Sequence, residues 1–110
     1  MESITSLEFL KDFTEGDEER INKYVGMYLS SAEENAKEFK KLMDEQRLDE
    51  LRSIVHSMKP HFDFMGMKTA RALAETIEAS IIENTSIESL PEKVSELIAM
   101  IEQSLVELRH

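Results

Sequence analysis

One histidine of this sequence stands between two basic residues at helical spacing. His56 follows Arg52 by four residues and precedes Lys59 by three. Residues three and four positions apart are neighbours on a helix surface, so on a helix these side chains would form one strip. A neutral imidazole is a nucleophile near physiological pH, and cations beside it stabilise anions such as a phosphoryl group. The spacing therefore predicts a local positive patch around His56 that suits such an anion.

The apolar residues around His56 predict a helix with one buried face. From about residue 44 to residue 65 they recur at intervals of three and four, as Leu48, Leu51, Val55, Met58, Phe62 and Met65. At about 100° per residue, His56 lies about 130° from the centre of this seam. We therefore expect His56, Arg52 and Lys59 to face solvent. Asp63, four residues after Lys59, is placed to form an ion pair with it.

These residues also have simpler explanations. An exposed histidine on an amphipathic helix is most often only a solvated surface group. Arg52 is as readily a solvated charge as a binding residue. His61 lies about 90° from the seam, where we expect a structural residue at the boundary between core and solvent. Spacing alone leaves these alternatives open.

The segments before this helix are also predicted to be helical, because the chain has only 3 Gly and 2 Pro. A short amphipathic segment lies around residues 7–13. Asp17 is a candidate N-cap for a long helix over about residues 17–43. Ser30 and Ser31 precede two glutamates, so the helix has a possible bend or restart there.

The segments that follow complete an all-α fold. Gly66 is placed to end the helix of His56 in a left-handed conformation, and the next helix covers about residues 68–84. Ser89 and Glu92 match a capping box that would begin a last helix. Four principal helices joined by short loops pack most simply as an antiparallel four-helix bundle, with a short additional N-terminal helix. We expect residues 1–110 to form a single domain.

Composition excludes several classes of function. The chain has 23 acidic and 13 basic residues, a net charge of −10, and no cysteine. This charge disfavours nucleic acids and anionic membrane surfaces, and the lack of cysteine excludes disulfides and thiolate metal clusters. No apolar run approaches the roughly 20 residues that span a bilayer, and the N-terminus does not look like a signal peptide. We therefore expect a cytoplasmic, soluble protein.

The string VHSMKPHFDFMGM resembles the signature of histidine-containing phosphotransfer (Hpt) domains of multistep two-component phosphorelays. In that family the histidine is followed by a large aliphatic residue two positions later, by lysine three later and by glycine ten later. The residues at these positions here are Met58, Lys59 and Gly66. The next helix is also similar to the family, with Leu73 followed by Ile77 and Glu78. The resemblance covers nearly the whole chain.

The resemblance implies a function as a phosphocarrier. His56 would carry a phosphoryl group on Nε2 and exchange it with the aspartate of a response-regulator receiver domain, and Lys59 would neutralise the phosphoryl charge. The partners would be receiver domains and a hybrid sensor histidine kinase. The chain itself would be a monomer. It would need no cofactor, because the Mg²⁺ would be bound by the receiver. It would not be an ATP-dependent kinase, since it has no Gly-rich phosphate loop.

Two residues depart from the family pattern. Pro60 stands where the family commonly has glycine, so the proline ring would meet an approaching receiver. Proline also lacks the backbone N–H, which leaves the carbonyl of His56 without its hydrogen-bond partner in the helix. Phe64 is predicted about 150° from the seam. It would either contact the receiver, as Arg52 and Pro60 would, or be covered by the N-terminal segment, which we favour.

Two other kinds of function compete with this interpretation. Helical bundles hold metals through histidines and carboxylates, but His56 and His61 are five residues apart and point about 140° away from one another. We therefore expect no metal site. The second alternative is an acidic adaptor that recruits partners by its surface without any chemistry.

Overall fold

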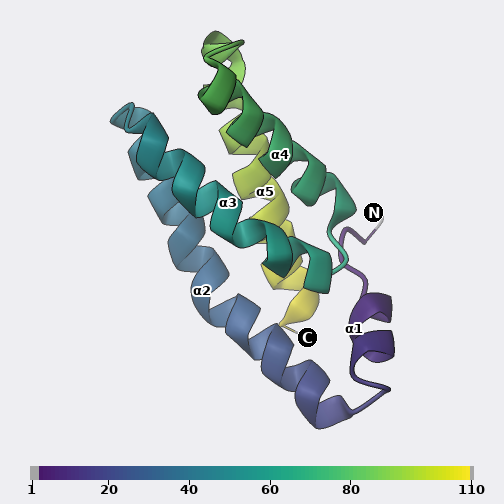
Figure 1. Ribbon diagram of the computed structural model, residues 1–110. Coiled ribbons are helices and arrows are strands. Elements are labelled where there is room, and N and C mark those ends of the chain that lie inside the picture. Colours follow the sequence, from purple (N-terminus) through teal and green to yellow (C-terminus); the bar gives the residue numbers. More distant parts are fainter. Residues whose placement is uncertain (1–2, 110) are drawn as a thin grey trace.

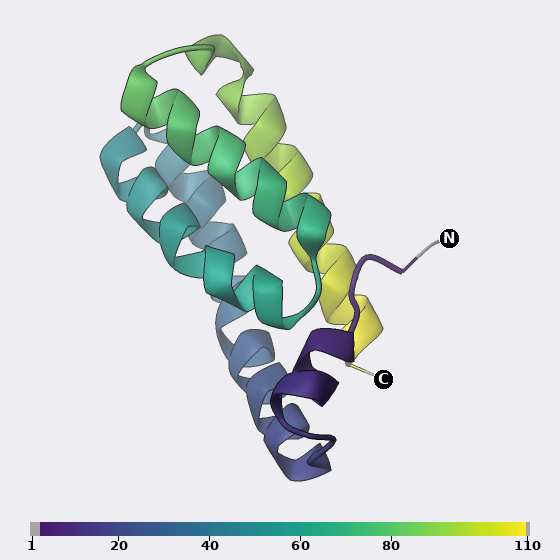
Figure 2. The ribbon, with the colours of Figure 1, turned by 45° about the vertical axis from the view of Figure 1, so that its right-hand side comes forward.

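The protein is a bundle of antiparallel helices. The structure, a computed structural model, describes residues 3–109, which contain α1 (Glu8–Phe13), α2 (Glu18–Asp44), α3 (Leu48–Phe64), α4 (Lys68–Glu83), the short 3-10 helix η1 (Ile87–Ser89) and α5 (Leu90–Leu108). Helices α2 and α4 each pack against both α3 and α5. Figures 1 and 2 show α1 at one end of the bundle, beside the start of α2 and the turn between α3 and α4. The predicted antiparallel four-helix bundle with a short N-terminal helix is confirmed. None of the helices in residues 3–109 combines the length and apolar character that a membrane crossing requires.

The core is formed by one apolar face from each long helix. The predicted seam of α3 is buried at Leu51, Val55, Met58, Phe62 and Met65, whereas Leu48 is only partly covered. In α2 Leu42 is fully buried and the adjacent Met43 only partly so, and in α5 Leu97 is fully buried and the adjacent Ile98 only partly so. A helix has 3.6 residues per turn, so a stripe that repeats every three or four residues drifts around the helix and includes neighbouring positions.

Helix α2 begins at its predicted cap and continues without interruption. The carboxylate of Asp17 accepts a hydrogen bond from the backbone N–H of Arg20 at 3.2 Å. The possible break at Ser30 and Ser31 does not occur. Both hydroxyls donate to the carbonyl of Met27, at 3.0 and 3.1 Å, so they bond the preceding turn instead of capping a new helix.

The capping box predicted at Ser89 and Glu92 is wrong in detail. Ser89 does precede α5, but its hydroxyl donates to the carbonyl of Ser86 at 2.8 Å and makes no cap bond to the helix. The reason is the 3-10 helix Ile87–Ser89, which brings the Ser86 carbonyl within reach of the serine hydroxyl.

Gly66 ends α3 in the predicted left-handed conformation, with a φ of +67°. A β-carbon at this position would overlap the backbone of Ser6. The N–H of Ser6 donates to the carbonyl of Met65 at 2.9 Å, so the N-terminal segment lies directly against the turn between α3 and α4. Glycine is required here both for its positive φ and for this close approach.

Glu107 of α5 holds the same N-terminal segment. Its carboxylate accepts hydrogen bonds from the Ser3 hydroxyl (2.7 Å), the Thr5 hydroxyl (2.6 Å) and N–H (3.0 Å), and the Ile4 N–H (3.0 Å). Partial burial alone would raise the pKa of Glu107, but these hydrogen bonds outweigh it and lower the pKa to about 2. The ionised carboxylate therefore fastens the segment that leads into α1.

Replacing Glu107 with glutamine tests this attachment. We expect Glu107→Gln to lower the free energy of unfolding at neutral pH by about 1–2 kcal/mol, because a neutral amide accepts these hydrogen bonds more weakly. A lowered pKa stabilises the folded state above the unfolded value of 4.5, and this contribution is lost as pH falls towards about 2. Urea unfolding across this range should therefore show a difference between the two proteins that shrinks in acid. Glu102→Gln, on the exposed side of α5, is the control; a difference that does not depend on pH would contradict the prediction.

Candidate functional site

His56 lies on the outer face of α3. Its side chain is 65% exposed, whereas its neighbours Val55 and Met58 are buried in the bundle. The helix wheel predicted this exposure, because the buried seam fixes which way the rest of the helix faces. The imidazole is therefore accessible to a large partner.

One carboxylate from the next helix joins the two central side chains of the site. Glu78 of α4 contacts His56 Nδ1 with Oε2 at 2.6 Å and accepts a hydrogen bond from Lys59 Nζ on Oε1 at 3.1 Å. The side chains of Glu78 and Lys59 are only 16% and 15% exposed. The pair therefore lies where α3 packs on α4, with the imidazole projecting beyond it.

The charge of Glu78 determines which nitrogen of His56 is available. Partial burial would raise the pKa of Glu78, but the hydrogen bonds from Lys59 and His56 and the charges of both groups lower it overall. An ionised carboxylate only accepts hydrogen bonds, so Nδ1 of His56 must be the donor. In the neutral ring the lone pair then lies on Nε2, the nitrogen that Glu78 does not contact.

Of the three side chains expected to face solvent, His56 does so, whereas Arg52 is partly covered and Lys59 is only 15% exposed. Lys59 pairs with Glu78 and not with Asp63, whose carboxylate instead accepts from Arg71 Nε of α4 at 2.9 Å. Arg52 is partly covered and has no ion-pair partner within residues 3–109. A wheel of one helix shows only that helix's residues, so it could not show that α4 brings a carboxylate between the imidazole and the lysine.

Pro60 and Phe64 lie farther along the same helix. Helix α3 continues through Pro60, whose ring is exposed. Phe64 is partly covered by aromatic rings, with ring centroids 5.6 Å from Phe9, 5.7 Å from Phe13 and 5.2 Å from Tyr24. The favoured interpretation, that the N-terminal segment folds over Phe64, is confirmed. A role of either residue in docking stays a prediction.

The other histidine within residues 3–109 does not form a second centre. His61 is partly buried, as expected for a residue at the boundary of the core. Within residues 3–109, no cluster of three or more histidine, aspartate or glutamate side chains is arranged to hold a metal ion.

Glu78 is the residue of this site that spacing alone did not identify. It follows Ile77, which is fully buried, so the apolar stripe of α4 does place it at the edge of the core. Which residue of α3 it meets depends on the register between the two helices. That register depends on how the side chains of the whole core pack, which does not appear as a spacing in the sequence.

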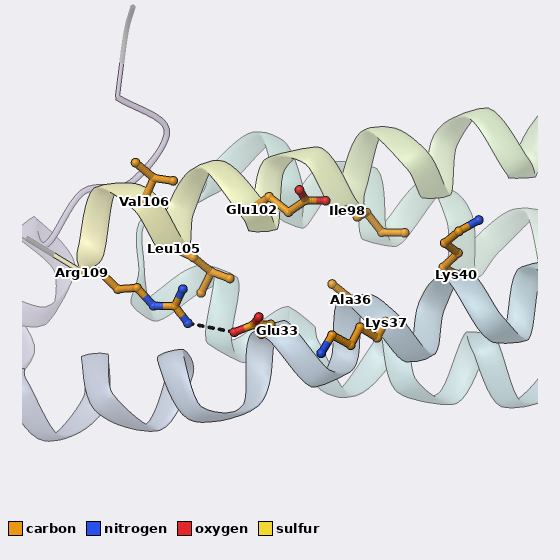
Figure 3. Close-up of a pocket in the computed structure, with 9 residues that line it drawn as sticks. All are labelled: Glu33, Ala36, Lys37, Lys40, Ile98, Glu102, Leu105, Val106 and Arg109. Atoms are coloured by element: carbon orange, nitrogen blue, oxygen red, sulfur yellow. Dashed lines mark hydrogen bonds and ion pairs between the residues drawn. The ribbon is translucent and has the colours of Figure 1, made fainter.

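A hollow elsewhere in the bundle is separate from this site. Figure 3 shows it between α2 and α5, where its lining includes Ala36, Ile98 and Leu105. Its volume is about 450 Å³. An ion pair between Arg109 and Glu33, at 3.0 Å, crosses one end. His56 and Glu78 belong to α3 and α4, so the hollow and the imidazole are formed by different helix pairs.

Comparison with known proteins gives one match. The family model of the Hpt domain matches residues 23–106, a range that includes His56, Lys59 and Glu78. Neither the curated proteins nor the solved structures gave a match.

The contact between His56 and Glu78 predicts a single tautomer of the neutral imidazole. We expect nitrogen NMR of the neutral imidazole of His56 to show the proton on Nδ1, because the Glu78 carboxylate accepts it. In Glu78→Ala this acceptor is lost and the population with the proton on Nε2 should rise. His61, which has no such carboxylate partner in the described structure, is the internal reference. A wild-type ring protonated mainly on Nε2 would contradict the assignment.

Proposed function

This chain belongs to the Hpt domain family, and on that basis we propose that His56 carries a phosphoryl group which it exchanges with the aspartate of a response-regulator receiver domain. The family resemblance found in the sequence is thereby confirmed. Hpt domains act in histidine phosphotransfer within two-component phosphorelays. The observation that carries the proposal is an exposed imidazole whose Nδ1 is bonded to Glu78 and whose Nε2 is left for reaction.

The proposed step is a displacement at phosphorus. The lone pair of Nε2 attacks the phosphorus of an aspartyl phosphate, the N–P bond forms, and the P–O bond breaks so that the aspartate leaves as a carboxylate. The reverse step returns the phosphoryl group to an aspartate. Because the partner supplies the second reacting group, an exposed histidine on a rigid helix suits this exchange better than a histidine within a cleft.

Lys59 is the cation best placed to stabilise the phosphoryl group. A phosphoryl group adds about two negative charges near neutral pH, and phosphoryl transfer depends mainly on positioning and on neutralising such charge. Lys59 follows His56 by one helical turn and is held by Glu78 at 3.1 Å, so its ammonium is already close to the ring. Arg52, one turn before His56, would be a second and weaker source of positive charge.

The proposed partners would supply the reacting groups that this chain lacks. Receiver domains would supply the aspartate and the Mg²⁺, and a hybrid sensor histidine kinase would introduce the phosphoryl group from ATP. We propose that this chain is a cytoplasmic monomer that needs no cofactor and has no kinase activity of its own. The exposed ring of Pro60, one turn beyond His56, would be part of the surface that meets the receiver.

Transfer of label from a partner tests the proposed function. After incubation with a receiver carrying radiolabelled aspartyl phosphate, we expect this chain to gain label that is lost in acid and retained in base, as a phosphohistidine is. His56→Gln should gain no label, whereas His61→Gln should be labelled as the wild type is. Label that persists in His56→Gln would assign the site elsewhere, and no label in any of the proteins across a panel of receivers would favour a purely structural adaptor.

Lys59→Ala separates catalysis from folding. We expect the rate of transfer from a receiver to fall by about ten- to a hundredfold, because the charge that stabilises the transferring group is removed. The free energy of unfolding should fall by only about 1 kcal/mol, since one hydrogen-bonded ion pair is lost. Arg71→Ala is the control, because Arg71 also links α3 to α4 but pairs with Asp63. Stopped-flow transfer and thermal unfolding measure the two effects; equal losses of rate in both variants would contradict the role of Lys59.

A further inference from the structure

Glu78 contacts the nitrogen of His56 that does not react, and this suggests a role beyond orienting the ring. We propose that Glu78 is the counter-ion of phosphorylated His56: it keeps a proton on Nδ1 through the whole reaction and so makes the phosphohistidine a readily discharged, short-lived donor. This inference rests on the proposed function and concerns the reactivity of its intermediate. It is carried by the 2.6 Å contact between Nδ1 and Oε2, by the low exposure of Glu78 and by the bond from Lys59 that fixes the carboxylate.

The proton balance of the step shows what the carboxylate does. Before transfer, the neutral ring has its proton on Nδ1 and its lone pair on Nε2. When Nε2 forms the bond to phosphorus and Nδ1 keeps its proton, the ring becomes an imidazolium cation. The Glu78 carboxylate at Nδ1 stabilises this cation as an ion pair with a charge-assisted hydrogen bond. No proton has to leave or enter the site when the phosphoryl group arrives.

The same proton decides how easily the phosphoryl group departs. If Nδ1 is protonated, the N–P bond breaks with its electron pair on Nε2 and the ring leaves as neutral imidazole. If Nδ1 has lost its proton, the ring would have to leave as an imidazolate anion, which is a much poorer leaving group. A carboxylate at Nδ1 favours the protonated form to a higher pH than a neutral acceptor would.

The other charged groups around the ring do not replace Glu78. Lys59 and Arg52, both on α3, are cations and disfavour a protonated ring. Lys59 bonds the second oxygen of Glu78, so it holds the carboxylate in place while leaving Oε2 to His56. The nearby Ser57 hydroxyl donates to the carbonyl of Ile54 at 2.7 Å and is not turned to the imidazole. In the described structure Glu78 is thus the group in contact with Nδ1.

The test is the lifetime of phosphohistidine as a function of pH in Glu78→Gln. Glutamine has the same shape and still accepts from Nδ1 but carries no charge. The full chain is labelled from a phosphorylated receiver, separated from it, and followed between about pH 5 and 9. We expect the midpoint of the decay profile to move to lower pH by about one unit, so that the half-life near neutral pH becomes about tenfold longer. Discharge to a fresh receiver should slow by a similar factor.

Two further variants make the result decisive. Glu75→Gln removes the same charge from α4 but its carboxylate pairs with Arg71, so its decay profile should match that of the wild type. Glu78→Asp keeps the charge with a shorter reach and should retain a midpoint nearer to the wild type, which also serves if Glu78→Gln does not fold. Equal profiles for wild type and Glu78→Gln, or equal shifts in Glu78→Gln and Glu75→Gln, would overturn the inference while leaving His56 as the carrier. Absence of label in the wild type would instead refute the proposed function.

Discussion

The register between α3 and α4 is the constraint on which the site depends. His56 and Lys59 come from one helix and Glu78 from the other, so a shift of one turn, about 5.4 Å, would separate the carboxylate from both. The register is set by the turn at Gly66, where the N-terminal segment passes too closely for a β-carbon. The pair between Asp63 and Arg71 ties the same ends of the helices at 2.9 Å. The buried seam of α3 also contributes to the register, because it fixes how this helix is rotated about its axis.

The packing of α3 on α4 gives His56 a fixed orientation although it lies on the surface. An exposed side chain is normally free to change its rotamer, and an ordered geometry at the surface costs conformational entropy. Here only the imidazole is exposed, while its two partners are mostly covered by the packing of α3 on α4. The rigid part of the site is therefore contributed by the bundle, and the imidazole projects beyond it. A partner of the size of a whole domain could reach the ring without any opening motion.

Local patterns in the sequence predicted what depends on one helix and missed what depends on two. The exposure of His56 and the left-handed Gly66 follow from spacing within one segment and are confirmed. Asp63 was assigned to Lys59 because they are four residues apart, but such a pair gains only a few tenths of a kcal/mol and loses to a guanidinium across the helix interface. Glu78 was visible as a residue of the family motif, yet its contact with His56 needs the interhelical register. The register between α3 and α4 is set by the packing of the whole core.

The carboxylate of Glu78 also affects how much the charge of this protein can contribute to binding a partner. The chain has a net charge of −10, so the proposed receiver, with an acidic pocket around its aspartate, would not be attracted to it at long range. With Lys59 paired to Glu78, the site itself offers little uncompensated positive charge before the partners meet. Binding must then depend on short-range contacts of the surface around His56, where apolar groups such as Pro60 are exposed. In the proposed transfer, the negative charge of the phosphoryl group would compete with Glu78 for the ammonium of Lys59. The lysine would then stabilise charge during transfer rather than during encounter.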